Sequence, residues 1–105
     1  MWLVNGNNLQ MSEEDFGVAL SASFVGATLT VNDVLRFTFK DKPNGETILE
    51  KEYIATNNQF SIVLTKEESK LFPPGKYVFS VKWYQSESFM CCLVENGTFK
   101  VGDVA

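Results

Sequence analysis

The fold of this chain is decided by residues 33–83, which read DVLRFTFKDKPNGETILEKEYIATNNQFSIVLTKEESKLFPPGKYVFSVKW. Short runs in which apolar and polar residues alternate are separated by clusters of Pro, Gly, Asn and Asp. Alternation with a period of two is typical of strands that bury one face, and closely spaced turn signals are typical of two-sheet proteins. The stretch therefore predicts an antiparallel, immunoglobulin-like β-sandwich.

Three runs within this stretch place large apolar residues on one face, and a period of two indicates that this face points inward. The residues predicted to point inward are Leu35, Phe37 and Phe39 in the first run, Phe60, Ile62 and Leu64 in the second, and Tyr77, Phe79, Val81 and Trp83 in the third.

Two local signals predict how these strands are connected. Residues 43–45, Pro-Asn-Gly, are typical of a hairpin loop, because Pro fixes its own φ and Asn-Gly accepts positive φ. Thr65 is followed three residues later by Glu68, which is the spacing of a capping box. This spacing predicts a helical turn over residues 66–71.

Alternation also extends outside this stretch. Residues 9–12 predict a first strand, and the apolar run 89–94 predicts a central strand. Asn96-Gly97 predicts a bend or bulge within the last strand. We expect about seven strands and one short helical turn in a single domain over residues 1–105. A further strand is predicted over residues 16–24, with one face formed by Phe16, Val18, Leu20, Ala22 and Phe24.

The strand Thr47–Ile54 carries charged residues on both faces, which suits an edge strand protected against unwanted pairing. This strand and the N-terminal segment Trp2–Met11 are the predicted protein-contact elements. Tyr84 and Phe89 are additional candidates for exposed aromatic contacts. The predicted contact residues are Trp2, Leu9, Met11, Ile48, Glu50, Glu52 and Ile54.

Composition argues against several classes of function. The net charge is −4 and the nine Lys and Arg residues are scattered, which argues against a nucleic-acid surface. The chain has no His, the usual general base near neutral pH, so no catalytic site is expected. The loops between the predicted strands are short, so no long active-site lid is expected. We also expect no cofactor.

Metal and membrane sites are not expected either. Cys91 and Cys92 are adjacent and have no His beside them, so we predict two free thiols, one buried and one outward, and no zinc site. The acidic residues 13–15 lack the spacing of a calcium loop. No run reaches the roughly 20 apolar residues of a membrane span, and residues 1–8 do not read as a secretion signal. We therefore expect no membrane partner.

A series of short motifs in the second half of the chain carries a family resemblance. Leu64-Thr65 leads into a charged turn at Lys66–Leu71, and Gly75-Lys76-Tyr77 opens a long strand. Residues 97–101, Gly-Thr-Phe-Lys-Val, precede a terminal Asp-Val-Ala at 103–105. In this order and spacing the residues resemble the immunoglobulin-like domain of phage tail and baseplate proteins, such as the N-terminal domain of the baseplate upper protein family.

The resemblance implies a non-enzymatic structural or assembly module of a phage or prophage tail or baseplate. Its partners would be other phage structural proteins or copies of itself, with a homo-oligomer as one form. It would be a virion component assembled in the bacterial cytoplasm. Two alternatives stay open, because a fold alone does not determine function. One is an adhesin-like module that binds carbohydrate or a cell surface, and the other is a small enzyme or regulator on a sandwich scaffold.

Overall fold

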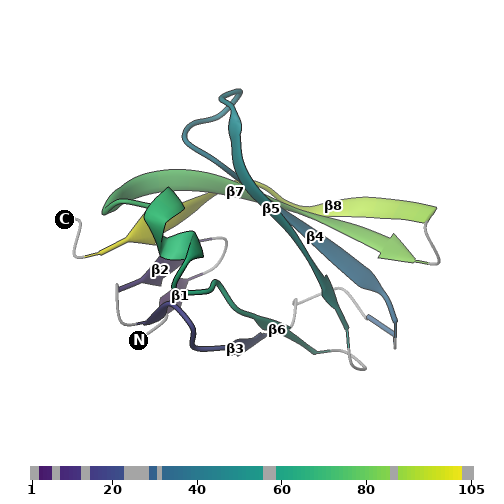
Figure 1. The fold of residues 1–105 in the computed structure, drawn as a ribbon. Coiled ribbons are helices and arrows are strands. Elements are labelled where there is room, and N and C mark those ends of the chain that lie inside the picture. The colour runs from purple at the N-terminus through teal and green to yellow at the C-terminus, as the bar shows by residue number, and fades with distance from the viewer. Residues whose placement is uncertain are drawn as a thin grey trace.

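The structure is a computed structural model that describes residues 3–5, 8–12, 15–22, 29–30, 32–55, 59–85 and 88–102. These residues form an all-β sandwich of one six-stranded and one two-stranded sheet, with one short 3-10 turn (Figure 1). The elements are β1 (Leu3–Asn5), β2 (Asn8–Met11), β3 (Leu20–Ala22), β4 (Val34–Lys40), β5 (Thr47–Ile54), β6 (Phe60–Ile62), η2 (Glu68–Leu71), β7 (Gly75–Gln85) and β8 (Ser88–Val101).

The large sheet has the strand order β1-β2-β8-β7-β4-β5, so β1 and β5 are its two edges. The small sheet pairs β3 with β6 and lies across from the long strands in Figure 1. Every neighbouring pair is antiparallel except β2 and β8, which run parallel. The predicted sandwich is confirmed. The parallel pair and the eighth strand among the described residues differ from the expected arrangement.

The core forms on the inner face of β4, where the predicted alternation is confirmed. Leu35, Phe37 and Phe39 are buried, whereas the residues between them are partly exposed. The ring centroid of Phe37 lies 5.3 Å from that of Tyr53 and 5.9 Å from that of Phe60. Because Phe60 belongs to β6, this contact joins the two sheets. Ring pairs of this kind contribute about 0.5–1.5 kcal/mol each beyond the area they bury.

A second group of rings closes the sandwich next to η2. Phe72 follows this turn directly, and its ring centroid lies 5.4 Å from Phe99, 5.6 Å from Phe39 and 5.2 Å from Tyr77. Phe72 and Phe99 are both buried. The chain that leaves β6 is therefore fixed against β4, β7 and β8.

The predicted turns are confirmed. Asn44, in the loop between β4 and β5, has a positive φ of 62°. The Thr65 backbone N–H donates to Glu68 Oε1 over 2.8 Å, and the Glu68 N–H donates to Thr65 Oγ1 over 3.2 Å. This is the reciprocal bonding of a capping box. The helical turn that follows is a 3-10 turn and spans only Glu68–Leu71.

The strand predicted over residues 16–24 is wrong before Leu20. Phe16 is buried and Val18 is exposed, so the two do not share a face. The cause is a turn at Asp15, since the Val18 N–H donates to the Asp15 carbonyl and Gly17 has a φ of 90°. Only Leu20–Ala22 is a strand, and Phe24 lies outside the described residues.

The prediction that residues 89–94 form a central strand is confirmed for β8 as a whole, which lies between β2 and β7, but not for its first half. β2 pairs with β8 only from Thr98 to Val101, and the first half of β8 has β7 as its partner. Phe89 and Met90 are consequently exposed. The register between β7 and β8 shifts at three places, one of them opposite Asn96, whose φ is 53°. The predicted bulge at Asn96-Gly97 is confirmed.

A buried carboxylate fixes the start of β4. Asp33 is almost fully buried and accepts hydrogen bonds from Thr30 N, Thr30 Oγ1 and Trp83 Nε1, the last over 3.0 Å. Burial alone would raise the pKa of Asp33, but these hydrogen bonds outweigh it and hold the pKa below its ordinary value. The ionised side chain therefore ties the loop before β4 to β7.

A second polar cluster holds β5 against the chain that follows β6. Lys51 Nζ donates to the Val63 carbonyl over 2.9 Å and to Glu68 Oε1 over 2.8 Å. The Tyr53 hydroxyl donates to the same carbonyl over 2.7 Å. Burial raises the pKa of Tyr53 to about 12, and the charge of Glu68 acts in the same direction.

The high pKa of Tyr53 predicts a loss of stability in alkali. The unfolded tyrosine ionises near pH 10, so the unfolded state releases its proton first and stability falls as pH rises from 10 to 12. We expect Y53F to lose about 1 kcal/mol near pH 7, through its hydrogen bond, and to decline less steeply above pH 10. Urea unfolding between pH 7 and 12 measures both effects. Y84F is the control and should keep the steep decline; parallel wild-type and Y53F curves above pH 10 would contradict the assignment.

Candidate interaction surface

The outer face of the large sheet is the side of β4, β5, β7 and β8 that points away from the aromatic core. Its residues occupy the positions between the buried ones, because side chains alternate across a strand. Among the described residues, no second layer of strands covers this face (Figure 1). The outer face contains Val34, Arg36 and Thr38 of β4, Glu50, Glu52 and Ile54 of β5, Ser80, Lys82 and Tyr84 of β7, and Phe89 of β8.

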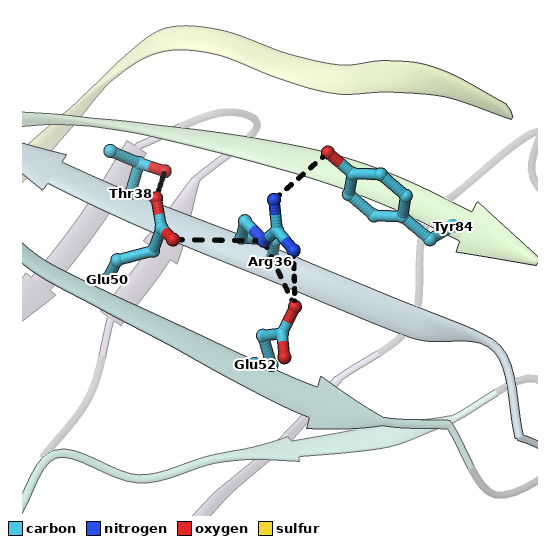
Figure 2. A network of polar contacts seen from close by, with 5 residues as sticks. All are labelled: Arg36, Thr38, Glu50, Glu52 and Tyr84. Atoms are coloured by element: carbon cyan, nitrogen blue, oxygen red, sulfur yellow. Dashed lines mark hydrogen bonds and ion pairs between the residues drawn. The ribbon is translucent and has the colours of Figure 1, made fainter. Parts of the chain in front are cut away.

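Arg36 organises the centre of this face, as Figure 2 shows. Its Nη2 lies 2.8 Å from Glu52 Oε2, and its Nε lies 3.8 Å from Glu50 Oε1. Arg36 Nη1 donates to the Tyr84 hydroxyl over 3.3 Å, and the guanidinium carbon lies 4.7 Å from the centre of the Tyr84 ring. Thr38 Oγ1 donates to Glu50 Oε2 over 3.3 Å. One cation thus connects side chains from three strands in a fixed arrangement.

An apolar row crosses the same face beside this network. The row consists of Ile54, Val34, Tyr84 and Phe89, which are cross-strand neighbours in the order β5-β4-β7-β8. Ile54 is 64% exposed and Phe89 is 55% exposed. The rings of Tyr84 and Phe89 are 5.6 Å apart. Single exposed apolar residues are ordinary, but a contiguous set is typical of an interaction site.

Several predicted contact residues meet on this surface. Glu50, Glu52 and Ile54 all lie on the outer face, and β5 is an edge of the large sheet as predicted. Arg36 lies between Leu35 and Phe37, which were predicted to point inward, so alternation implies that it points outward, but nothing in the sequence connects it to Glu52. The signal was the register, which sets Arg36 opposite Glu52 and which alternation alone does not reveal.

Ile48 differs from its predicted position. It is partly buried and packs against the core. The register between β4 and β5 shifts after Phe39, so that Leu49 pairs with Phe39 while Thr47 pairs with Lys40. A bulge of this kind re-aims a side chain. Ile48 therefore does not belong to the outer face.

The prediction that Leu9 and Met11 contact a partner is wrong. Leu9 is 7% exposed and Met11 is 0% exposed, and both belong to the core. They are buried because β2 pairs with the last residues of β8, next to Phe99 and Val101, on the inner face. The free edge at this side of the sheet is β1. Trp2 lies outside the described residues.

Within the described part of the chain, no group of three or more His, Cys, Asp or Glu side chains could hold a metal ion. Cys91 and Cys92 are both free thiols as predicted, but Cys92 is exposed and Cys91 is only partly buried, so neither is the fully buried thiol that was expected. No helix among the described residues is long and apolar enough to span a membrane. A recess of about 240 Å³ lies beside β5 and is lined by Ser21, Tyr53, Ile54, Gln59, Phe60 and Ser61.

Comparison of the chain with protein-family models, with curated proteins and with solved structures finds no match. What the protein does must therefore be inferred from its own residues. The outer face, with its Arg36 network and apolar row, is the strongest candidate among the described residues.

The exposure of the Arg36 network predicts that it orders the surface more than it stabilises the fold. The side chains of Arg36 and Glu52 are 37% and 51% exposed, and exposed ion pairs are typically worth about 0.2–1 kcal/mol. A double-mutant cycle of R36M and E52Q, measured by urea unfolding, should give a coupling energy in this range that shrinks in about 1 M salt. The pair K76M and E52Q should be additive. A coupling above about 2 kcal/mol would show instead that the network supports the fold.

Proposed function

We propose that this protein is a non-enzymatic structural module of a phage or prophage tail or baseplate that works through protein–protein contacts. The single observation that supports this proposal best is the outer face, where a contiguous apolar row adjoins the Arg36 network. The order of motifs from Leu64 to Val101, which resembles the phage domain, supports the finer assignment.

The composition of the outer face suits a protein contact. Tyr and Arg are enriched among the residues that contribute most to binding, and both meet here in Arg36 and Tyr84. The hydrogen bonds to Glu52 and Tyr84 hold the Arg36 side chain in place before binding. Less conformational entropy is then lost when a partner docks. Ile54 and Phe89 add exposed apolar area at the two ends of the row.

A non-enzymatic role is supported by the chemistry of the surface. The sequence contains no His. Glu50 and Glu52 both lie within ion-pair distance of the same Arg36, so the two carboxylates at the centre of this face are already paired with a cation. In this proposal the partners are other virion proteins or copies of the chain, which is assembled in the bacterial cytoplasm.

One observation favours a second candidate, an adhesin-like module that binds carbohydrate or a cell surface. Tyr84 and Phe89 form an aromatic pair on the outer face, next to the polar side chains of Arg36 and Glu52. Exposed aromatic faces beside hydrogen-bonding groups can also pack against sugar rings.

Particle fractionation tests the proposal. After prophage induction in the source bacterium, particles are purified on a density gradient and the chain is quantified by mass spectrometry. We expect the chain to co-sediment with tail proteins at a fixed ratio. The double variant I54E/F89E should be incorporated at least about tenfold less, since two charges would be buried in an apolar contact. L71E, at an exposed apolar position away from the outer face, is the matched control.

Two results would contradict the assignment. Particles that lack the chain would rule out a virion component. Recovery of the chain on isolated cell walls, lost in a Y84A variant, would favour the carbohydrate-binding candidate.

A further inference from the structure

We infer that the free edge of β5 binds an extended segment of another protein that carries Lys or Arg at alternate positions, and that it does not pair with β5 of a second copy. This inference rests on the proposed function, because it names the chemistry of the partner for the same surface. Adding a strand to a sheet edge is a common way to bind a peptide, since the main chain supplies the hydrogen bonds.

The first support is the open backbone of β5. This strand is eight residues long and ends the order β1-β2-β8-β7-β4-β5. Among the described residues, β5 pairs with β4 as its only neighbouring strand. Backbone hydrogen bonds to residues outside this pairing begin at Ala55, the residue after the end of β5. One side of the strand therefore presents N–H and C=O groups that a further strand can use.

The second support is the way charge is distributed between neighbouring strands. On the outer face, β4 presents Arg36 and Thr38, and β5 presents Glu52 and Glu50 opposite them. One guanidinium serves two carboxylates, and each carboxylate side chain is still 51% exposed. A strand added beyond β5 would place its own side chains opposite Glu52 and Glu50. Opposite charges in such pairs contribute roughly 0.2–1 kcal/mol each, so basic residues are favoured there.

The same charges disfavour a second copy as the occupant. If two β5 strands paired antiparallel with their outer faces continuous, the registers of greatest overlap would set the two Glu50 side chains opposite each other, or Glu50 opposite Glu52. Like charges directly opposite each other in a sheet are destabilising. The edge of β5 is therefore not complementary to a second β5 edge. A strand with basic residues would instead pair its positive charges with Glu50 and Glu52.

The C-terminal end of β5 adds an apolar requirement. Ile54 is the most exposed large apolar residue described, and it lies on the same face as the two carboxylates. The recess of about 240 Å³ beside it is lined on the inner side by Tyr53 and Phe60. A partner segment that fits would carry two basic residues opposite Glu50 and Glu52 and an apolar residue opposite Ile54. The side chain that follows would point toward the recess.

Charged residues on an edge strand also suppress aggregation, and this protective role alone would give an edge that binds nothing. The two roles are compatible, because charges that repel an identical strand attract one of opposite charge. A peptide-binding experiment distinguishes the two cases, because an edge that only prevents aggregation binds no peptide, whereas a selective edge binds a basic one.

To test the inference, the full chain is titrated with three synthetic octapeptides, and binding is measured by NMR. The first alternates Lys with Thr and Val, the second has Glu in place of each Lys, and the third is the Lys peptide with N-methyl groups on alternate amides. We expect the Lys peptide to bind at least about tenfold more tightly than the Glu peptide, with shift changes along Thr47–Ile54. N-methylation should abolish binding, because it removes the main-chain donors.

Matched variants locate the charge effect. The double variant E50Q/E52Q should lose most of the preference for the Lys peptide. The control E95Q removes a carboxylate charge from an exposed position on β8, which β7 and β4 separate from β5, and this variant should keep the preference for the Lys peptide. Light scattering of the wild-type chain over a concentration series should show no association through β5.

The inference is overturned if the wild-type chain binds neither peptide, if N-methylation has no effect, or if the chain associates with itself in a way that E50Q/E52Q strengthens. These failures are distinct from failure of the proposed function. If E50Q/E52Q is incorporated into particles as well as wild type, the contact lies elsewhere on the outer face. If particles lack the chain but the Lys peptide binds, the edge site stands without the virion assignment.

Discussion

The packing of Phe37 against rings from both sheets is the interaction on which the rest of the structure depends. Phe37 lies between Phe79 on the neighbouring strand β7 and Tyr53 on β5, and it reaches Phe60 on the opposing sheet. Burying a phenylalanine side chain contributes roughly 1.5–3 kcal/mol, and the aromatic pairs add to this. Because every second residue of β4 is drawn inward, the side chains between them must face out. The position of Arg36 is therefore a direct consequence of the position of Phe37.

The inner face of the sheet stabilises the fold, whereas the outer face carries the charged and apolar surface. The protein can therefore present this surface without weakening its fold. The inner face contains the aromatic rings, and the clusters around Asp33 and Lys51 attach the neighbouring loops to it. The outer face contains a network whose side chains remain partly exposed. Substitutions there change what the surface can bind more than they change stability. β5 belongs to both systems, since Lys51 and Tyr53 anchor its inner side while its edge stays open.

Much of the fold could be predicted from the sequence where alternation is regular. The inward residues of β4, β6 and β7 follow a strict period of two, and the turn at Asn44 and the capping box at Thr65 are local signals. The parallel pairing of β2 with β8 could not be predicted, because short alternation gives a period but no partner. Leu9 and Met11 were misplaced for that reason. The exposure of the first half of β8 could not be predicted from its apolar run. Register shifts interrupt the alternation of side chains between the two faces there, so apolar residues in this run are not all buried.

The candidate site was predictable in part. Glu50, Glu52 and Ile54 could be recognised because β5 carries charge on both faces, which few buried strands do. The contribution of Arg36 and Tyr84 depends on which residues of β4, β5 and β7 lie opposite one another, and that register is set by the core. Ile48 was predicted to lie on the surface, but it packs against the core because of the bulge between β4 and β5, which alternation does not reveal.

Amide hydrogen exchange at residue resolution would measure whether the edge of β5 is open in solution. In an open edge strand, the N–H groups that point away from β4 have no partner, while those that point toward it are protected. Every second amide between Thr47 and Ile54 should therefore exchange orders of magnitude faster than its neighbours and than the amides of β4. Slow exchange at all amides of β5 would show instead that the edge is already covered and unable to accept a further strand.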